Sequence, residues 1–158
     1  TAAEPMMVQA LALRKKLLGD DNAEVTDSLS GLGAVYAQQG RLDEAEAMFR
    51  QAWGIGKKLP GSEPSQIVNL LSDLLIVLKK QQNFAASEPV MLEANELVQQ
   101  SPQFATDEKR IWIEKLRRFY IEWAVAAPGT GKMDKVSEWG KKLIEFDERS
   151  QQPKAGSK

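Results

Sequence analysis

Carboxylates and amines are the side chains that could carry out chemistry here, because the sequence contains neither histidine nor cysteine. Thiolate nucleophiles, disulfides and Cys/His metal sites are therefore excluded, and the commonest general base near neutral pH is missing. Hydrolysis by paired carboxylates needs two that face each other across a cleft. The acidic residues instead occupy positions expected on solvated helix faces or in first turns: Asp43, Glu44, Glu46, Glu93, Glu96, Glu145 and Asp147. We therefore expect no catalytic residues, no metal site, no cofactor and no enzymatic activity.

The segment 126–133 is close to a phosphate-binding loop, Gly-x-Pro-Gly-x-Gly-Lys-Ser/Thr. Ala126 replaces the first glycine, and Met133 replaces the hydroxyl residue that would hold Mg²⁺. The motif also requires a preceding buried strand, whereas the residues before Ala126 follow a helical pattern. We therefore interpret this segment as a loop between two helices.

Aromatic residues recur at helical spacing between Trp112 and Trp123. Such a stripe could cage a cation or stack a base, but at this spacing it is far more typical of a core. The short basic pairs 117–118 and 141–142 are interpreted as solvated faces. The formal net charge is −1, so no long-range field favours nucleic acid or an anionic membrane. The apolar run 74–78 is far shorter than the roughly 20 residues of a membrane span. We expect neither a nucleic-acid nor a membrane partner.

The elements that position these residues are all predicted to be helices, because proline and glycine occur mainly at intervals that would separate helices. Gly40 is predicted to end one helix, and Thr106 is predicted to be the N-cap of another. Seven helices are expected, at about 5–18, 23–39, 43–59, 64–82, 84–100, 106–126 and 133–148.

The sequence repeats itself with a period of 42 residues. Leu32 maps to Leu74, and Phe49 maps to Met91. A period of this size indicates stacked supersecondary units that bury their apolar faces against neighbours, which favours a binding surface over an enzyme.

The first copy resembles a tetratricopeptide repeat, and its period and the segment 40–46 resemble the kinesin-light-chain type. The residues that match the family pattern are Leu29, Leu32, Gly33, Tyr36, Ala45, Phe49 and Ala52. Small residues at three of these positions would let two antiparallel helices approach, while Leu32, Tyr36 and Phe49 fill the space between them. The resemblance implies an all-α, right-handed α-α superhelix, a TPR-like solenoid.

The copies of the repeat match the family pattern to different degrees. Residues 10–19 resemble the second helix of a preceding repeat, so we expect an orphan helix at about 5–18. Repeat 1 spans about 23–59 and repeat 2 about 64–100, where Gln82 replaces Gly40. A divergent cap follows at about 106–149, with Arg117 where a small residue is expected and a turn that arrives seven residues late. The whole repeat domain covers 1–149, and 150–158 is expected to be a flexible tail.

These features predict a non-catalytic protein-interaction or scaffolding module that binds a peptide or a partner helix in a concave groove. In this family the first helix of each repeat lines that groove. The candidate groove residues are Asp27, Ser30, Ala34, Gln38, Asn69, Ser72, Ile76, Lys79, Glu114 and Arg118. Use of the groove only as a spacer remains open.

The alternative is a regulatory or self-association segment of a larger bacterial multidomain protein. The region 116–143 resembles the C-terminal end of repeat regions in such proteins, of which serine/threonine kinases are one example. Self-association would use the exposed end of the first helix.

Overall fold

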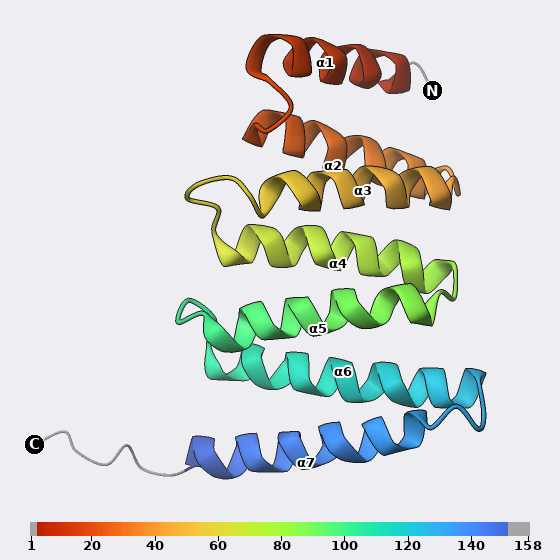
Figure 1. Cartoon of the computed structure of the whole chain (residues 1–158), viewed down its shortest axis with the longest axis vertical. Helices are drawn as coiled ribbons and strands as arrows, with labels where there is room; N and C mark the ends of the chain where they lie inside the picture. The colour runs from red at the N-terminus through yellow and green to blue at the C-terminus, as the bar shows by residue number, and fades with distance from the viewer. Residues whose placement is uncertain (1–2, 152–158) are drawn as a thin grey trace, which may run out of the picture. The chain divides into compact units, whose positions relative to one another are not determined.

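The computed structural model describes residues 3–151, and within them every regular element is an α-helix (Figure 1). The seven helices are α1 (Ala3–Leu18), α2 (Ala23–Gln38), α3 (Leu42–Gly56), α4 (Pro64–Lys80), α5 (Phe84–Gln100), α6 (Thr106–Ala126) and α7 (Lys132–Gln151). The expectation of an all-α repeat fold with seven helices is therefore confirmed. None of these helices combines the length and apolar character that crossing a bilayer requires.

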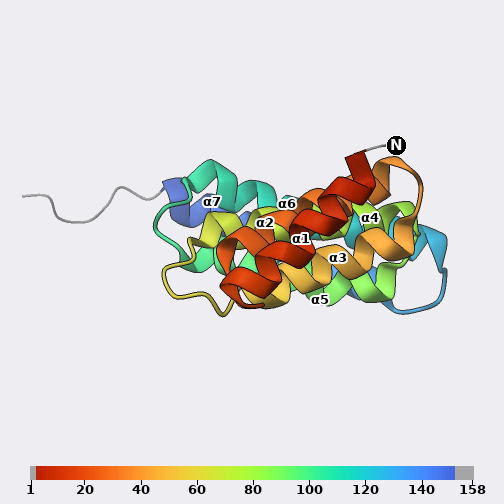
Figure 2. The ribbon, with the colours of Figure 1, turned by 90° about the horizontal axis from the view of Figure 1, so that it is seen from above.

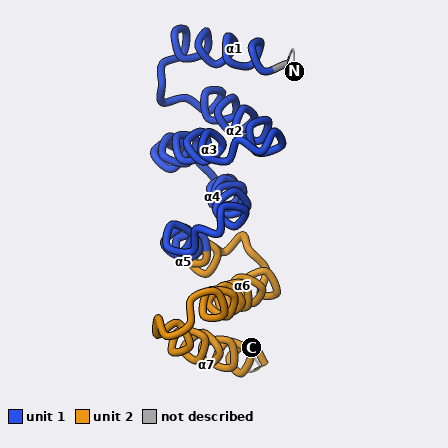
Figure 3. The backbone as a smooth tube through the Cα atoms, turned by 90° about the vertical axis from the view of Figure 1, so that its right-hand side faces the viewer, with its two compact units in different colours: residues 1–94 blue, residues 95–158 orange. Residues whose placement is uncertain are grey.

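The chain divides into two compact units, which meet inside α5 between Ala94 and Asn95 (Figure 3). The N-terminal unit contains α1 to α4 and the first part of α5. The C-terminal unit contains the end of α5 together with α6 and α7.

The core of the N-terminal unit is built from the residues that carry the repeat pattern. Leu29, Ala45 and Ala52 are fully buried, and Phe49 is 3% exposed. A Cβ atom on Gly33 would lie 3.1 Å from the Phe49 ring, so glycine is what allows α2 and α3 to approach this closely. The predicted packing of Phe49 against a small residue is confirmed.

Two equivalent turns join the helix pairs. Gly40 ends α2 with φ 78°, and the N–H groups of Gly40 and Arg41 donate to the carbonyl oxygens of Ala37 and Tyr36. This pattern of two bonds back into the last helical turn is a Schellman motif, which places its first residue beyond the helix in the left-handed region.

The same turn recurs 42 residues later without a glycine. Gln82 has φ 55°, and the N–H groups of Gln82 and Asn83 donate to the carbonyl oxygens of Lys79 and Leu78. Repeat 2 therefore keeps the turn geometry of repeat 1 although its residue type is less suited to it.

Helix α1 packs on α2 (Figure 2). A Cβ atom on Gly31 would lie 3.2 Å from the terminal methyl of Met7. Glu4 accepts hydrogen bonds from Arg41 at 2.6 Å and from Gln39 at 3.1 Å. The Arg41 guanidinium also lies 4.1 Å from the centre of the Tyr36 ring. The helix that the sequence predicts as an orphan is thus joined to repeat 1 by close packing and by an ionic link.

In the C-terminal unit, α6 and α7 form a hairpin whose core contains Trp112, Leu116, Tyr120 and Trp139. The interpretation of the aromatic stripe as core is confirmed for Trp112, Leu116 and Tyr120, whereas Phe119 and Trp123 are half-buried. Arg110 joins the helices through two hydrogen bonds to the carboxylate of Asp147, at 2.8 and 3.2 Å.

Arg117 occupies the position of Gly33 two periods later, where close packing was in question. The structure supplies the missing space on the other helix. Gly140 is the counterpart of Phe49 once the seven extra residues are counted, and its Cβ position lies 3.6 Å from the side chain of Arg117. The large and small partners have exchanged helices.

Several predicted boundaries are wrong by a few residues. Thr106 is the first helical residue and not the N-cap, because Ala105 has the extended backbone and donates its N–H to the Glu108 carboxylate at 2.8 Å. Helix α3 ends at Gly56, whose carbonyl oxygen accepts from the Ser62 hydroxyl. The structure extends α7 through 150–151, and 152–158 lie outside the described residues.

Candidate partner groove

The predicted groove residues of the N-terminal unit lie on α2 and α4, the first helices of the two repeats, which contact each other. On α2, Asp27, Ala34 and Gln38 are exposed, while Ser30 is half-buried. Asn22 caps this helix by accepting the Glu24 N–H at 2.8 Å, which fixes where the helix begins.

On α4, Asn69, Ile76 and Lys79 are exposed and Ser72 is half-buried. The Ser72 hydroxyl donates to the carbonyl oxygen of Val68 at 2.7 Å, so its hydrogen is used within the helix. Ile76 is 56% exposed, whereas most of the apolar residues around it are buried. The exposed face of α4 is therefore polar, with one large apolar side chain between Ser72 and Lys79.

Glu114 and Arg118 lie on α6 and belong to the C-terminal unit, where both are exposed. Glu114 pairs with Arg110 at 3.3 Å on its own helix. Ile111 and Ile121 are 47% and 37% exposed on the same helix. This face repeats the mixture of polar and apolar side chains seen on α4.

Asp73 is a residue of α4 that the sequence analysis did not select. It is half-buried, and burial raises the pKa of its carboxyl group. It stands one period after Gly31, the position at which α2 receives Met7 of α1. The presence of a carboxylate at Asp73, where repeat 1 has a glycine, is the feature of the sequence that could have identified this residue.

Six of the seven carboxylates considered as catalytic candidates accept a hydrogen bond from another side chain: Asp43, Glu44, Glu46, Glu93, Glu96 and Asp147. Glu93 accepts the indole N–H of Trp53 at 3.2 Å, and Asp147 binds Arg110. Within residues 3–151 no cluster of three or more acidic side chains is placed to hold a metal ion.

The glycine-rich segment is confirmed as a connection between α6 and α7, and it follows a helix where a phosphate-binding loop requires a strand. Gly129 and Gly131 adopt left-handed backbone, and the Thr130 hydroxyl donates to the carbonyl oxygen of Ala127 at 2.8 Å. The Lys132 ammonium lies 3.6 Å from the centre of the Trp123 ring. The lysine of the apparent motif thus packs over an aromatic face.

Comparison with known proteins agrees with this architecture. A family model described as tetratricopeptide repeat matches residues 1–58. No curated protein matches the sequence. Tetratricopeptide repeats generally mediate protein–protein interaction and are typically non-catalytic scaffolds.

Solved structures with the same fold include BtubC (BKLC) from P. vanneervenii, at 12% identity and a TM-score of 0.69 over 99% of this chain. The chain spans 61% of the length of that structure. The nearly identical TPR-like repeats assigned to a kinesin light chain of Podosopora anserina match at 16% identity and a TM-score of 0.67. That match covers 96% of this chain and 69% of the other. The tetratricopeptide-repeat model therefore matches the first 58 residues, and the chain as a whole has the same fold as these kinesin-light-chain-like repeat structures.

Proposed function

We propose that this chain is a non-catalytic interaction module that binds an extended peptide or a partner helix on the exposed face of α2 and α4. The observation that carries the proposal is Ile76. It is 56% exposed in the last third of α4, between the groove positions Ser72 and Lys79, although Leu74, Val77 and Leu78 are completely buried. An apolar anchor surrounded by polar groups suits recognition of a peptide.

The proposal is tested by affinity capture from an extract of the cells in which the protein is native. The groove variant combines Asn69→Asp with Lys79→Glu, both at exposed positions. The matched control makes the same change of charge on another surface, Gln51→Glu with Lys58→Glu, also at exposed positions. We expect the groove variant to lose proteins that the wild type and the control both capture. Identical captured sets for all three chains would remove the groove from the account.

A second candidate function is self-association or regulation within a larger protein through α1. Its support is the exposed apolar side chains of Met6, Leu13 and Leu17, which are 70%, 57% and 70% exposed. Leu13→Asp is the informative change, because Leu11 is partly buried against the core of repeat 1. Concentration-dependent dimers in size-exclusion chromatography that disappear in Leu13→Asp would support this function. A monomer at every concentration would exclude self-association.

A further inference from the structure

The two units differ in the contacts between the second helices of neighbouring repeats, which are α3 and the first part of α5 in the N-terminal unit and the end of α5 and α7 in the C-terminal unit. In the N-terminal unit, the Trp53 indole of α3 donates to the Glu93 carboxylate of α5 at 3.2 Å. The Lys57 ammonium lies 4.3 Å from the centre of the Trp53 ring and covers it. This bridge links α3 to the first part of α5.

The counterparts of the bridging residues in the C-terminal unit are Asn95 and Lys142. Asn95 lies one period after Trp53, and Lys142 corresponds to Glu93 when the period and the seven extra residues are counted. Asn95 accepts from Gln99 on its own helix at 3.2 Å. Lys142 binds Glu138 on its own helix at 2.8 Å. Both polar groups are thus directed along their helices, in place of the bridge.

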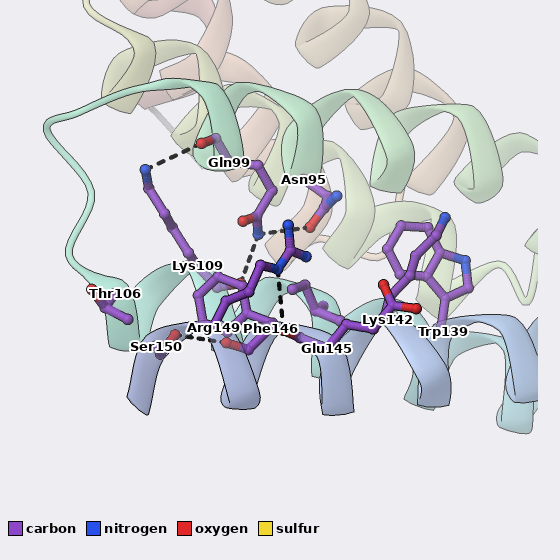
Figure 4. A pocket seen from close by; sticks show the side chains of 11 residues that line it. Asn95, Gln99, Thr106, Lys109, Trp139, Lys142, Glu145, Phe146, Arg149 and Ser150 are labelled. Carbon is purple, nitrogen blue, oxygen red and sulfur yellow. Dashed lines mark hydrogen bonds between the residues drawn. The ribbon is translucent and has the colours of Figure 1, made fainter. Parts of the chain in front are cut away.

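An open pocket of about 730 Å³ lies beside Asn95 and Lys142, lined by the end of α5, the first half of α6 and the part of α7 from Trp139 to Ser150 (Figure 4). This volume is within the range of pockets that bind ligands. One wall is fixed by a reciprocal pair: the Gln99 amide donates to the carbonyl oxygen of Lys109 at 2.7 Å, and the Lys109 ammonium donates to that of Gln99 at 3.1 Å. Because these two hydrogen bonds hold α5 and α6 together beside the pocket, they favour a preformed site.

The lining combines an apolar part with a cationic part. Ile113 and Trp139 are 5% and 6% exposed, so each presents only a small apolar area. Three lining residues, Lys109, Lys142 and Arg149, are cationic, and Glu145 is the one acidic lining residue. The Arg149 Nε donates to the carbonyl oxygen of Glu145 at 3.1 Å, which uses one of the five N–H donors of a guanidinium.

We propose that this pocket is a docking site for an acidic peptide segment of a partner protein, separate from the groove on α2 and α4. A leucine-sized side chain of the peptide contacts Ile113 and Phe146. Flanking carboxylates bind Arg149 and take the place of Glu138 on Lys142, whose ammonium lies 4.0 Å from the centre of the Trp139 ring. Charge complementarity selects this occupant, since the lining carries two more positive than negative side chains. The chain's own segment 152–158 has two lysines and no acidic side chain, so its charge does not complement the pocket.

The test is fluorescence anisotropy with a fluorescein-labelled pentapeptide that has a central leucine between two pairs of acidic residues. We expect saturable binding that weakens at higher salt. Arg149→Glu and Lys142→Glu should each weaken binding by about tenfold or more, the effect of losing a charge-assisted hydrogen bond. The matched control is Lys141→Glu, which makes the same charge change at an exposed position of α7 outside the pocket lining. Circular dichroism confirms that each variant is folded.

Two further peptides separate the parts of the proposal. A peptide with lysines in place of the acidic residues should not bind, and a peptide with alanine in place of leucine should bind more weakly. Equal binding of all three peptides, no saturable binding at millimolar peptide, or equal weakening by Lys141→Glu would overturn the assignment. The groove variant Asn69→Asp with Lys79→Glu should bind the pentapeptide as the wild type does. Failure of the pocket and failure of the groove are therefore distinguishable.

Discussion

Replacing Gln82 by glycine should stabilise the protein. Gln82 has φ 55° in the turn between α4 and α5, and the equivalent turn one repeat earlier has Gly40 at φ 78°. An L-residue in the left-handed region costs about 1–2 kcal/mol. Glycine offsets part of this gain, because its greater freedom in the unfolded chain costs about 0.4–1 kcal/mol. The expected net stabilisation is about 0.5–1 kcal/mol, or about 1–4 °C in melting temperature for a chain of this size.

The reciprocal change gives the matched control. Gly40→Gln should destabilise by about the same 0.5–1 kcal/mol, because it imposes the same backbone on an L-residue. Gln81→Gly should also destabilise, by about 1–2 kcal/mol, since Gln81 has φ −76°, needs no glycine, and donates a hydrogen bond to Asp43 at 2.9 Å. The free energy of unfolding should therefore rise in Gln82→Gly and fall in both Gly40→Gln and Gln81→Gly.

Urea unfolding followed by circular dichroism measures these differences, with amide exchange at Asn83 as a local readout. The Asn83 N–H donates to the carbonyl oxygen of Leu78 at 2.9 Å and should be better protected in Gln82→Gly. A lower midpoint for Gln82→Gly than for the wild type would refute the reasoning, because it would mean that Gln82 does not adopt the left-handed turn.

Four further predictions concern the packing, the hydrogen-bonded bridge and the ionic link of the N-terminal unit. Phe49→Ala should cost about 3–5 kcal/mol in urea unfolding. Gly33→Ala should cost about 1–3 kcal/mol, because its Cβ would lie 3.1 Å from the Phe49 ring, and should become neutral or stabilising when combined with Phe49→Ala. Trp53→Phe should cost about 1–2 kcal/mol by removing an indole N–H bonded to a carboxylate, and an unchanged midpoint would contradict the bridge. Hydrogen bonding to Arg41 lowers the pKa of Glu4 below 4.5, so its stabilising contribution is complete above that pH and is lost as pH falls through the lower, folded value. The melting temperature of the wild type should therefore be higher than that of Glu4→Gln near neutral pH, and the difference between the two should become smaller in acid. A difference in melting temperature that does not change with pH would contradict the ionic link between Glu4 and Arg41.

Repeat 1 could be predicted from the sequence because each of its contacts depends on residue types that the sequence states directly. Gly33 and Phe49 are a small and a large residue at positions that must meet, and the structure places them in contact. Helix boundaries were less accurate, since they depend on which side chain satisfies the terminal N–H groups. At α6 that side chain is Glu108 and not Thr106.

The exchange of Gly33 and Phe49 for Arg117 and Gly140 could not be predicted by examining one helix at a time. A position-by-position comparison finds an arginine where a small residue is expected and indicates poor packing. Only the pairing of both helices, across a turn displaced by seven residues, reveals the compensating glycine.

The exposed groove positions could be predicted from helical periodicity, whereas the pocket of the C-terminal unit could not be predicted from the sequence. Exposure of Ile76 depends on which face of α4 is buried, which the apolar pattern of one helix predicts. The pocket depends on three separate helices and on a missing bridge, for which Asn95 and Lys142 give no signal when each is taken alone. A feature that depends on side chains from several helices, such as this pocket, could not be predicted from the pattern of any single helix.

Site-specific photocrosslinking tests the central claim most directly. A benzophenone amino acid replaces Ile76 on the exposed face of α4 and, as a control, Gln51 on the exposed surface of α3. The chain is irradiated in an extract of the cells in which it is native, and adducts are identified by mass spectrometry. We predict a discrete protein adduct from position 76, and its loss when Asn69→Asp and Lys79→Glu are added. Adducts of equal yield from position 51, or none from position 76, would contradict the assignment of this face as the partner surface.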